Sequence, residues 1–215
     1  MLRIYAVADI HGRADKLAFI LDKLDVLQPD ALVVAGDIAG RADSGRIIEK
    51  LSNSPAPVLG IRGNTDRPAV DHWLGNHTNT VCLHLKQWNL RGIPFVGVSG
   101  TFVYPFGSRL AVREAPVLRA LEPLVNDTTI LVAHPPPWGV LDRAFGRFHV
   151  GCRSLRALIK KRRPRLLICG HVHEHPGVDS LGTTQVVNCS VAHTGQGALI
   201  CLAADRIIEI TMLSA

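Results

Sequence analysis

The stretch RIYAVADIH, residues 3–11, decides the fold, because an apolar run typical of a buried strand stops there at a carboxylate and an imidazole. The same arrangement recurs along the chain. The runs ALVVAGD, VLGIRGN, TILVAH and LLICGHVH stop at Asp37, at Asn64, at His134, and at His171 and His173, as the first stops at Asp9 and His11. In open α/β sheets, functional side chains gather beyond the carboxyl ends of the strands. We therefore expect these side chains to cluster at one edge.

Segments of helical period separate the apolar runs. Apolar residues at Leu17, Ile20, Leu21, Leu24 and Leu27 fit one helix face, and Pro29 ends that helix. Further helices are expected near 47–51, 112–121 and 153–161, with short β signals from 80 to 101. After residue 170 the pattern favours antiparallel strands. Alternating strands and helices indicate parallel pairing, so we predict an α/β protein with a mixed sheet or two packed sheets flanked by helices.

Length and composition predict one domain over residues 1–215. With 47% hydrophobic and 20% charged residues, the chain is typical of a globular protein and not of a disordered one. The first residues lack a signal-peptide cleavage site, and no apolar window approaches a membrane span, so we expect a cytoplasmic protein without a membrane partner. The formal charge of +6 favours anionic partners in general.

The residue types at the strand ends indicate transition metals. Imidazoles with carboxylates suit Mn, Fe, Zn, Co or Ni, whereas an all-oxygen set would suit Mg or Ca. In Asp9-Ile10-His11 and in the HVH of residues 171–173, side chains two apart on extended backbone point the same way. Gly36, Gly63 and Gly170 stand directly before three of the candidates, where a missing side chain permits close approach.

Each of these features alone has an ordinary explanation. An Asp after a strand commonly caps a helix or turn, and Gly-Asn is a common turn. A His after an apolar run is more often a core or loop residue than a ligand. If these explanations held at every strand end, five unrelated coincidences would be needed in one chain. Their joint occurrence favours a shared site.

The order D-x-H, G-D, G-N-x-D, a lone H, and G-H-x-H resembles the calcineurin-like metallophosphoesterases, from Asp9 through His173. The tract HPPPWG at 134–139 and the run HVGCRSL at 149–155 are similar to the small bacterial and archaeal phosphodiesterase-like branch. This resemblance implies a four-layer α/β/β/α fold, in which two packed mixed β-sheets are flanked by helices. It also implies a dinuclear-metal phosphoesterase.

The resemblance further assigns the ligands. Asp9, His11 and His173 would bind the first metal, Asn64, His134 and His171 the second, and Asp37 would bridge the two. The cofactors would be two divalent transition metal ions, with Mn the first choice and Fe, Ni, Co or Zn as alternatives. A hydroxide bridging them would attack phosphorus in a nucleotide or other small phosphodiester. Asp37 and Asn64 would thus also serve catalysis.

The chain departs from the family pattern at Thr65, where many members carry a His that protonates the leaving oxygen. Our first candidate to replace it is His149, although a surface or capping role is about as plausible. Arg153 and the start of its helix could meet a phosphate. Trp138 could form a wall of a substrate pocket, or pack within its loop.

Other functions stay open at this point. A phosphomonoesterase such as a protein phosphatase would use the same metals, and a non-catalytic metal-binding interaction module could keep the same fold. Basic residues concentrate between 153 and 165, but such runs are usually solvated helix faces, so nucleic acid is possible as a partner and not favoured. The sequence leaves the native substrate and the oligomeric state undetermined.

Overall fold

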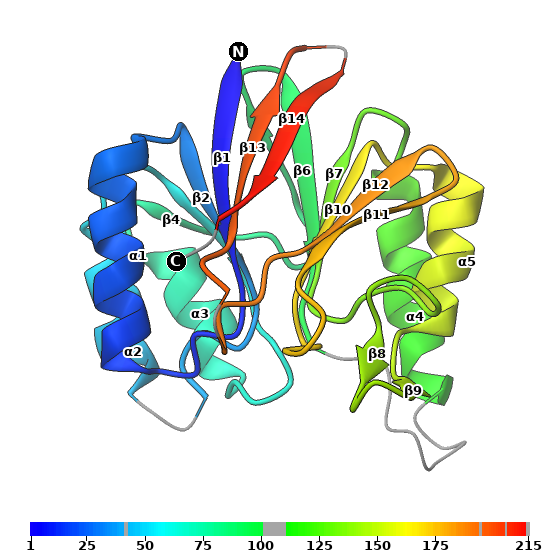
Figure 1. Cartoon of the computed structure of the whole chain (residues 1–215), viewed down its shortest axis with the longest axis horizontal. Helices are drawn as coiled ribbons and strands as arrows, with labels where there is room; N and C mark the ends of the chain where they lie inside the picture. Colours follow the sequence, from blue (N-terminus) through cyan, green and yellow to red (C-terminus); the bar gives the residue numbers. More distant parts are fainter. Residues whose placement is uncertain (41–42, 101–110, 194, 205, 214–215) are drawn as a thin grey trace.

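Two six-stranded β-sheets pack against each other, with helices on both outer faces (Figure 1). The computed structural model describes residues 1–40, 43–100, 111–193, 195–204 and 206–213, and within 111–115 only the backbone. The fold is therefore the expected four-layer α/β/β/α arrangement. No helix in the described part of the chain is long and apolar enough to cross a membrane.

The first sheet has the order β14 (Ile207–Met212), β13 (Ala198–Leu202), β1 (Leu2–Val7), β2 (Ala31–Ala35), β3 (Val58–Ile61) and β4 (Thr80–Cys82). Strands β1 to β4 are parallel, whereas β13 is antiparallel to β1 and β14 to β13. The outer face of this sheet is covered by α1 (Ala14–Leu27), α2 (Ser44–Ser52) and α3 (Ala69–Asn76).

The second sheet has the order β11 (Gly177–Leu181), β12 (Thr184–Asn188), β10 (Leu166–Cys169), β7 (Ile130–Ala133), β6 (Ile93–Val98) and β5 (Gln87–Leu90). The four central strands are parallel, and the two edge strands are antiparallel to their neighbours. Its helices are α4 (Ala111–Leu121), followed by the 3₁₀ turn η1 (Glu122–Leu124), and α5 (Arg153–Arg162).

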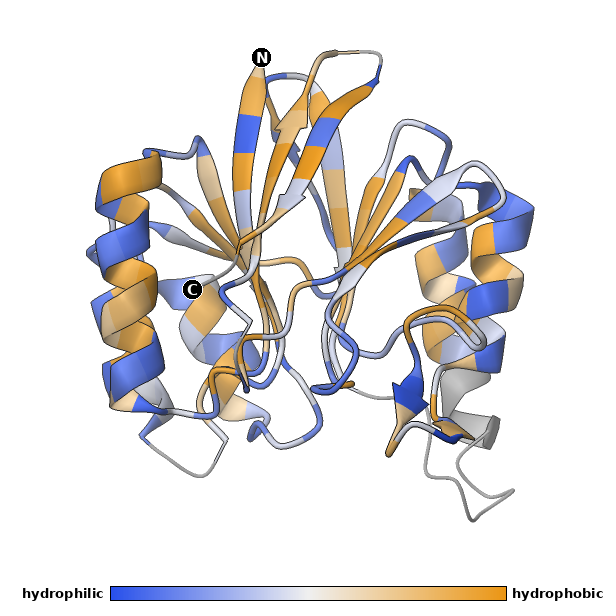
Figure 2. Cartoon of the chain, viewed as in Figure 1, coloured by the Kyte–Doolittle hydropathy of each residue, from blue (hydrophilic) through white to orange (hydrophobic). Residues whose placement is uncertain are grey.

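Three apolar layers hold the sheets and helices together, and Figure 2 shows the corresponding orange stripes on the inner strands and helix faces. The layer between the sheets includes Ile4 and Phe95, both fully buried. A second layer lies under α1 to α3, and a third under α4 and α5. The alternation of the strand residues thus places one face of each sheet in the shared core and the other under helices.

The sheets meet at the carboxyl ends of their parallel strands. Beyond β1, the Ala8 N–H donates to Cys189 O at 3.1 Å, and the Val191 N–H donates to Ala8 O at 2.9 Å. Cys189 and Val191 follow β12 of the second sheet. These two bonds extend β1 alongside the other sheet, so the strand ends of both sheets open onto the same region.

Several local expectations need correction. Helix α3 was not expected, because only Val70 and Leu74 mark its buried face over eight residues. The segment 134–151 has several Pro and Gly residues and no clear period, yet it contains a short hairpin of β8 (Arg143–Ala144) and β9 (Phe148–His149). After residue 170 the chain forms antiparallel pairs as expected, yet they lie in different sheets, and β12 pairs in parallel with β10.

Candidate metal centre

The structure brings all the strand-end candidates together in one cluster. Asp9 Oδ1 lies 3.5 Å from His173 Nε2, and His11 Nε2 lies 3.3 Å from the same nitrogen. Asp9, His11 and His173 form one group of side chains that could hold a metal ion, with ligand atoms within 4.8 Å of one another. This group combines loops that follow β1 and β10, and hence both sheets.

The other half of the cluster surrounds Asn64. Its Oδ1 lies 2.9 Å from His134 Nε2 and 3.0 Å from His171 Nδ1. The rings of these two histidines are 5.1 Å apart and meet edge to face. One amide oxygen and two imidazole nitrogens thus converge at a second position.

Asp37 lies between the two halves. Its Oδ2 is 3.8 Å from His11 Nε2 and 3.4 Å from His134 Nε2, and the carboxylate is almost fully buried. Asp37 and His134 also form a second potential metal group with Asp9. A carboxylate at this position can reach both halves of the cluster.

Four of the clustered residues have left-handed backbone, which is uncommon for residues other than glycine. The φ values are 64° at Asp9, 52° at His11, 50° at Asp37 and 70° at His171. The premise that the D-x-H and H-x-H segments are extended is therefore wrong at these positions, although the intervening Ile10 is buried in the core as expected. Such conformations cost about 1–3 kcal/mol each and concentrate at functional sites.

The glycines before the candidates allow these loops to lie against one another. A Cβ at Gly63 would overlap Asp37 Oδ1, and one at Gly36 would lie 2.6 Å from His134 Nδ1. A Cβ at Gly170 would lie 2.8 Å from Asp9 Oδ2. The sequence predicted close approach of a metal or phosphate at these glycines. The groups that approach them in the structure include the neighbouring acidic and imidazole side chains and, at Gly170, the Cβ of Ala8.

Asp66 fixes the loops that carry Asp37 and Asn64. Its Oδ1 accepts the N–H groups of residues 39 and 40, at 2.8 and 3.0 Å. Its Oδ2 accepts those of Ile38 and Gly63, at 3.0 and 2.9 Å. These four backbone N–H groups lie beyond the ends of their strands and have no strand partner there. The buried carboxylate accepts all four, and so it connects the loop after β2 to the loop after β3.

The His134 ring directs Nε2 into the cluster. Its Nδ1 donates to the backbone oxygen of Ala35 at 2.8 Å, so Nε2 is the atom that faces Asn64 Oδ1 and Asp37 Oδ2. In a neutral imidazole this Nε2 is an acceptor, and it then faces two other acceptors. A cation among them, either a proton or a metal ion, resolves this conflict, so the residues present fit a metal ion.

The histidines have different charge states when only protons are bound. Burial lowers the pKa of His134, but its hydrogen bond to Asp37 and the charges of Asp37 and Asp9 raise it to about 9. Burial and the neighbouring His134 lower the pKa of His171 to about 4. Burial would raise the pKa of Asp37, yet its contacts with His134 keep it well below the usual value. The cluster therefore holds two carboxylates and at least one imidazolium at neutral pH.

Thr65 and His193 also lie next to the cluster. Thr65 Oγ1 is 3.3 Å from His11 Nδ1, and the Thr65 N–H donates to Asp37 Oδ1 at 2.9 Å. The His193 ring meets the His173 ring edge to face at 5.8 Å. His193 lies outside the motif order that singled out the other histidines, and its place beside the cluster depends on the tertiary fold.

His149, Trp138 and Arg153 form a separate group. His149 Nδ1 lies 2.6 Å from Oδ1 of the buried Asp142, whose Oδ2 accepts the Gly139 N–H at 2.8 Å. The Trp138 ring lies 5.3 Å from the His149 ring, and the Arg153 guanidinium lies 3.9 Å from the Trp138 ring centre. The segment 135–142 connects this group to His134.

Much of the basic run after Arg153 makes local contacts. Lys161 pairs with Glu122, Arg162 donates to Val125 O, and Arg165 donates to Ala204 O. These bonds hold α5 and its C-terminal loop in place. They support the interpretation of this run as a structural, solvated face.

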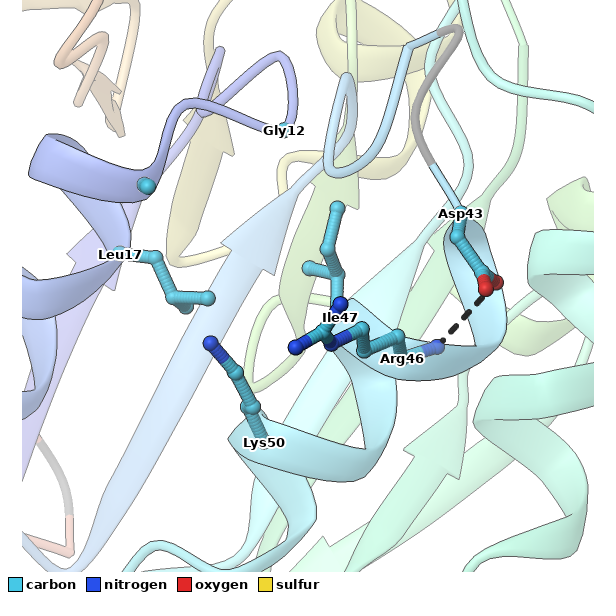
Figure 3. A pocket seen from close by; sticks show the side chains of 7 residues that line it. Gly12, Leu17, Asp43, Arg46, Ile47 and Lys50 are labelled. Atoms are coloured by element: carbon cyan, nitrogen blue, oxygen red, sulfur yellow. Dashed lines mark hydrogen bonds between the residues drawn. The ribbon is translucent and has the colours of Figure 1, made fainter.

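A cavity of about 350 Å³ lies between α1 and α2, beside the loop that carries His11 (Figure 3). Gly12 lines it at the end closest to His11, and the side chains of Arg46 and Lys50 point into it. Asp43 also lines it, but its carboxylate accepts the Gly45 and Arg46 N–H groups as the cap of α2. Arg46 and Lys50 therefore bring positive charge to the cavity.

The two-sheet fold and this imidazole–carboxylate cluster define a metal-dependent hydrolase. A sequence model of the calcineurin-like phosphoesterase family matches residues 2–175, so the chain belongs to that family and is a phosphoric ester hydrolase. An uncharacterised protein of Methanocaldococcus jannaschii is 30% identical over 201 residues, which cover 88% of each chain.

Solved structures share the fold. A protein of Thermus thermophilus superimposes with a TM-score of 0.70 at 19% identity, covering 98% of each chain. A dimetal phosphatase from Danio rerio superimposes with a TM-score of 0.67 at 12% identity, covering 99% of this chain and 98% of that one. At these identities, the likeness concerns the architecture.

The substitution Gly63→Ala should disrupt the cluster, because its Cβ would overlap Asp37. We expect a loss of bound metal and a lower unfolding temperature. Gly75→Ala is the matched control, since its Cβ would meet only Cys82 at 4.0 Å and alanine favours the α3 helix by about 0.5–1 kcal/mol. Elemental analysis and thermal unfolding would measure both. Normal metal content in Gly63→Ala would contradict the proposed packing.

Proposed function

We propose that this protein is a phosphodiesterase acting on a nucleotide or another small phosphodiester with the help of two divalent metal ions. The proposed ligands are Asp9, His11 and His173 for one ion, Asn64, His134 and His171 for the other, and Asp37 for both. Mn is our first choice among the metals, with Fe, Ni, Co and Zn as alternatives that suit the same imidazole and carboxylate donors.

The convergence of these side chains from both sheets is the observation that carries the proposal. Left-handed backbone at four of the proposed ligands lowers stability. An interaction module that had lost catalysis would gain stability by relaxing these positions. The presence of all four together favours the enzyme over the module.

The proposed roles follow from the chemistry of the side chains. Two bound divalent ions would activate water and neutralise charge on the phosphate. Asp37 is anionic and has two oxygens, as a ligand shared by two cations requires. Asn64 adds a neutral oxygen, so that the site carries less negative charge toward an anionic substrate. The Ala35 carbonyl holds the proton of His134 at Nδ1 and leaves Nε2 for binding.

Two arginines favour a diester over a monoester, because their charge is already compensated. Two arginines lie close to proposed ligands in the sequence, and both are paired: Arg13 with Asp15 at 2.6 Å, and Arg62 with Asp71 at 3.0 Å. A monoester is a dianion near neutral pH, whereas a diester is a monoanion and needs less additional positive charge. This distinction supports the diesterase and leaves the monoesterase as the alternative to be tested.

We propose His149 as the group that protonates the leaving oxygen. Asp142 holds its Nδ1, so the other ring nitrogen is directed away from that buried carboxylate. We also propose that Trp138 and Arg153, stacked beside it, contact the part of the substrate that leaves. The cytoplasmic location and the single domain over residues 1–215 stay predictions.

Metal-loaded protein should hydrolyse bis(p-nitrophenyl) phosphate faster than p-nitrophenyl phosphate. Asp37→Ala should reduce this activity by at least about 100-fold, because neither ion would keep its shared ligand. Asp22→Ala, on α1, is the matched control for loss of a carboxylate. The rate of p-nitrophenol release gives the activity of the wild type and of both variants. A preference for the monoester would overturn the substrate class, and no activity with any of the five metals would favour the interaction module.

His149→Gln should act selectively on poor leaving groups. We expect little change with a p-nitrophenyl ester, and a loss of about 10²- to 10⁴-fold with a dinucleotide whose leaving group is a sugar hydroxyl. Thr65→His in the same protein should restore part of the loss by placing an imidazole beside the cluster. His72→Gln is the surface control. Equal losses on both substrates would show that His149 has a structural role instead.

Metal binding should release a proton from His134. Below about pH 9 this imidazole is protonated in the metal-free protein, so binding becomes stronger as the pH rises and levels off above that value. Titration calorimetry with Mn²⁺ at pH 7.5, in buffers of different ionisation enthalpy, measures the protons released. His134→Ala should release about one proton fewer. The same titration should be repeated at higher pH. If the number of protons released did not decline toward pH 10, this would be evidence against the assignment to His134.

A further inference from the structure

The β8–β9 hairpin carries features that folding does not explain. It turns at Phe145 and Gly146, both with positive φ, at 51° and 68°, and the Arg147 N–H donates to Ala144 O at 3.2 Å. These are the marks of a type I′ turn, in which Asn, Asp or Gly is preferred at the position of Phe145. A bulky aromatic side chain with this backbone is strained.

Burial does not compensate for this strain. Phe145 is 81% exposed, and Phe148 is 63% exposed, so both rings lie largely in solvent. An exposed phenyl ring in a left-handed turn position therefore lowers stability through its backbone and contributes little stability through burial. A surface function offers a reason for this residue at this position.

The hairpin is also positively charged. Arg143 and Arg147 alternate with the two phenylalanines, both are exposed, and neither forms an ion pair with a side chain that the structure describes. The segment 143–149, RAFGRFH, contains no acidic residue. Asp142, directly before it, is buried and bound to His149 and to backbone N–H groups. The exposed surface of the hairpin thus combines cations with aromatic rings.

The hairpin lies at the end of the molecule that holds the candidate metal centre. Figure 1 shows β8 and β9 beyond the carboxyl ends of β7 and β10, the strands that precede His134 and His171. Its base is fixed by two hydrogen bonds, from the Cys152 N–H to Pro136 O at 2.8 Å and from the Trp138 N–H to Cys152 O at 3.1 Å. These bonds hold the base of the β8–β9 hairpin in place.

We propose that this hairpin binds single-stranded nucleic acid, with bases stacked on Phe145 and Phe148 and with Arg143 and Arg147 on the phosphates. This deepens the proposed phosphodiesterase by naming its substrate class, and rests on it in that respect. Alternating cations and aromatic rings match alternating phosphates and bases. A lipid surface fits less well, because a membrane against this end would cover the approach to the metal centre.

The test is a binding measurement that requires no turnover. We would measure the anisotropy of a fluorescein-labelled ten-residue oligothymidylate with the full chain, once in EDTA and once loaded with Mn²⁺. Phe145→Gly should weaken binding by about ten-fold or more, the size expected for one lost stacked base. Glycine also accepts the left-handed backbone, so the unfolding temperature of this variant should stay equal or rise.

Matched variants separate the contributions. Arg147→Ala should reduce the slope of log affinity against log salt by about 0.7, as expected for one phosphate contact to a single strand. Arg206→Ala on the β13–β14 hairpin and Val26→Ala on α1, both exposed positions, should leave binding unchanged. The two control variants, Arg206→Ala and Val26→Ala, should also keep wild-type turnover of bis(p-nitrophenyl) phosphate.

Each other result would overturn the proposal. Unchanged oligonucleotide affinity in Phe145→Gly would do so, and so would losses of equal size in the control variants. If Phe145→Gly instead lost binding to phosphatidylglycerol vesicles while it kept the oligonucleotide, the hairpin would be a membrane contact. Failure of the metal-loaded wild type on bis(p-nitrophenyl) phosphate would refute the proposed function alone, since the anisotropy comparison would still decide the role of the hairpin.

Discussion

The four N–H groups that converge on Asp66 are the constraint on which the candidate site depends. A strand that ends in a buried turn leaves backbone donors without partners, and each would cost about 1–3 kcal/mol if left unsatisfied. One carboxylate satisfies them for two loops and draws these loops together. Only then can Gly63 lie against Asp37, and only then does Asn64 reach the histidines of the other sheet.

The fold and the cluster were predictable because they depend on properties that the linear sequence carries. Strand burial follows from apolar runs, and in parallel strands the residue after each run necessarily lies at the carboxyl edge. The two-sheet architecture came from the resemblance, because runs such as those before His134 and His171 do not by themselves indicate a second sheet. That a ligand set acts in catalysis stays a prediction, since the fold positions the side chains without showing what they bind.

The parts that were missed depend on tertiary contacts. At the left-handed residues Asp9 and His171, the backbone N–H groups bond to partners distant in sequence, the Gly36 carbonyl and the Asp9 carboxylate, so a local pattern suggested extended chain. Helix α3 has only two buried apolar residues, too few to produce a recognisable period. The β8–β9 hairpin turns at Phe-Gly, a pair that is not a hairpin signal, because its first residue adopts a conformation that the sequence disfavours.

The distribution of the proposed ligands between the sheets has a mechanical consequence. Asp9 and Asp37 extend from the first sheet, whereas His134 and His171 extend from the second. Elsewhere in the described chain, apolar packing, hydrogen bonds and the ion pair between Arg91 and Asp30 join the two sheets. Ions bound there would have ligands from both sheets, and their binding free energy would add to the stability of the interface between the sheets. The concentration of available metal would then affect the free energy of unfolding as well as the rate of hydrolysis.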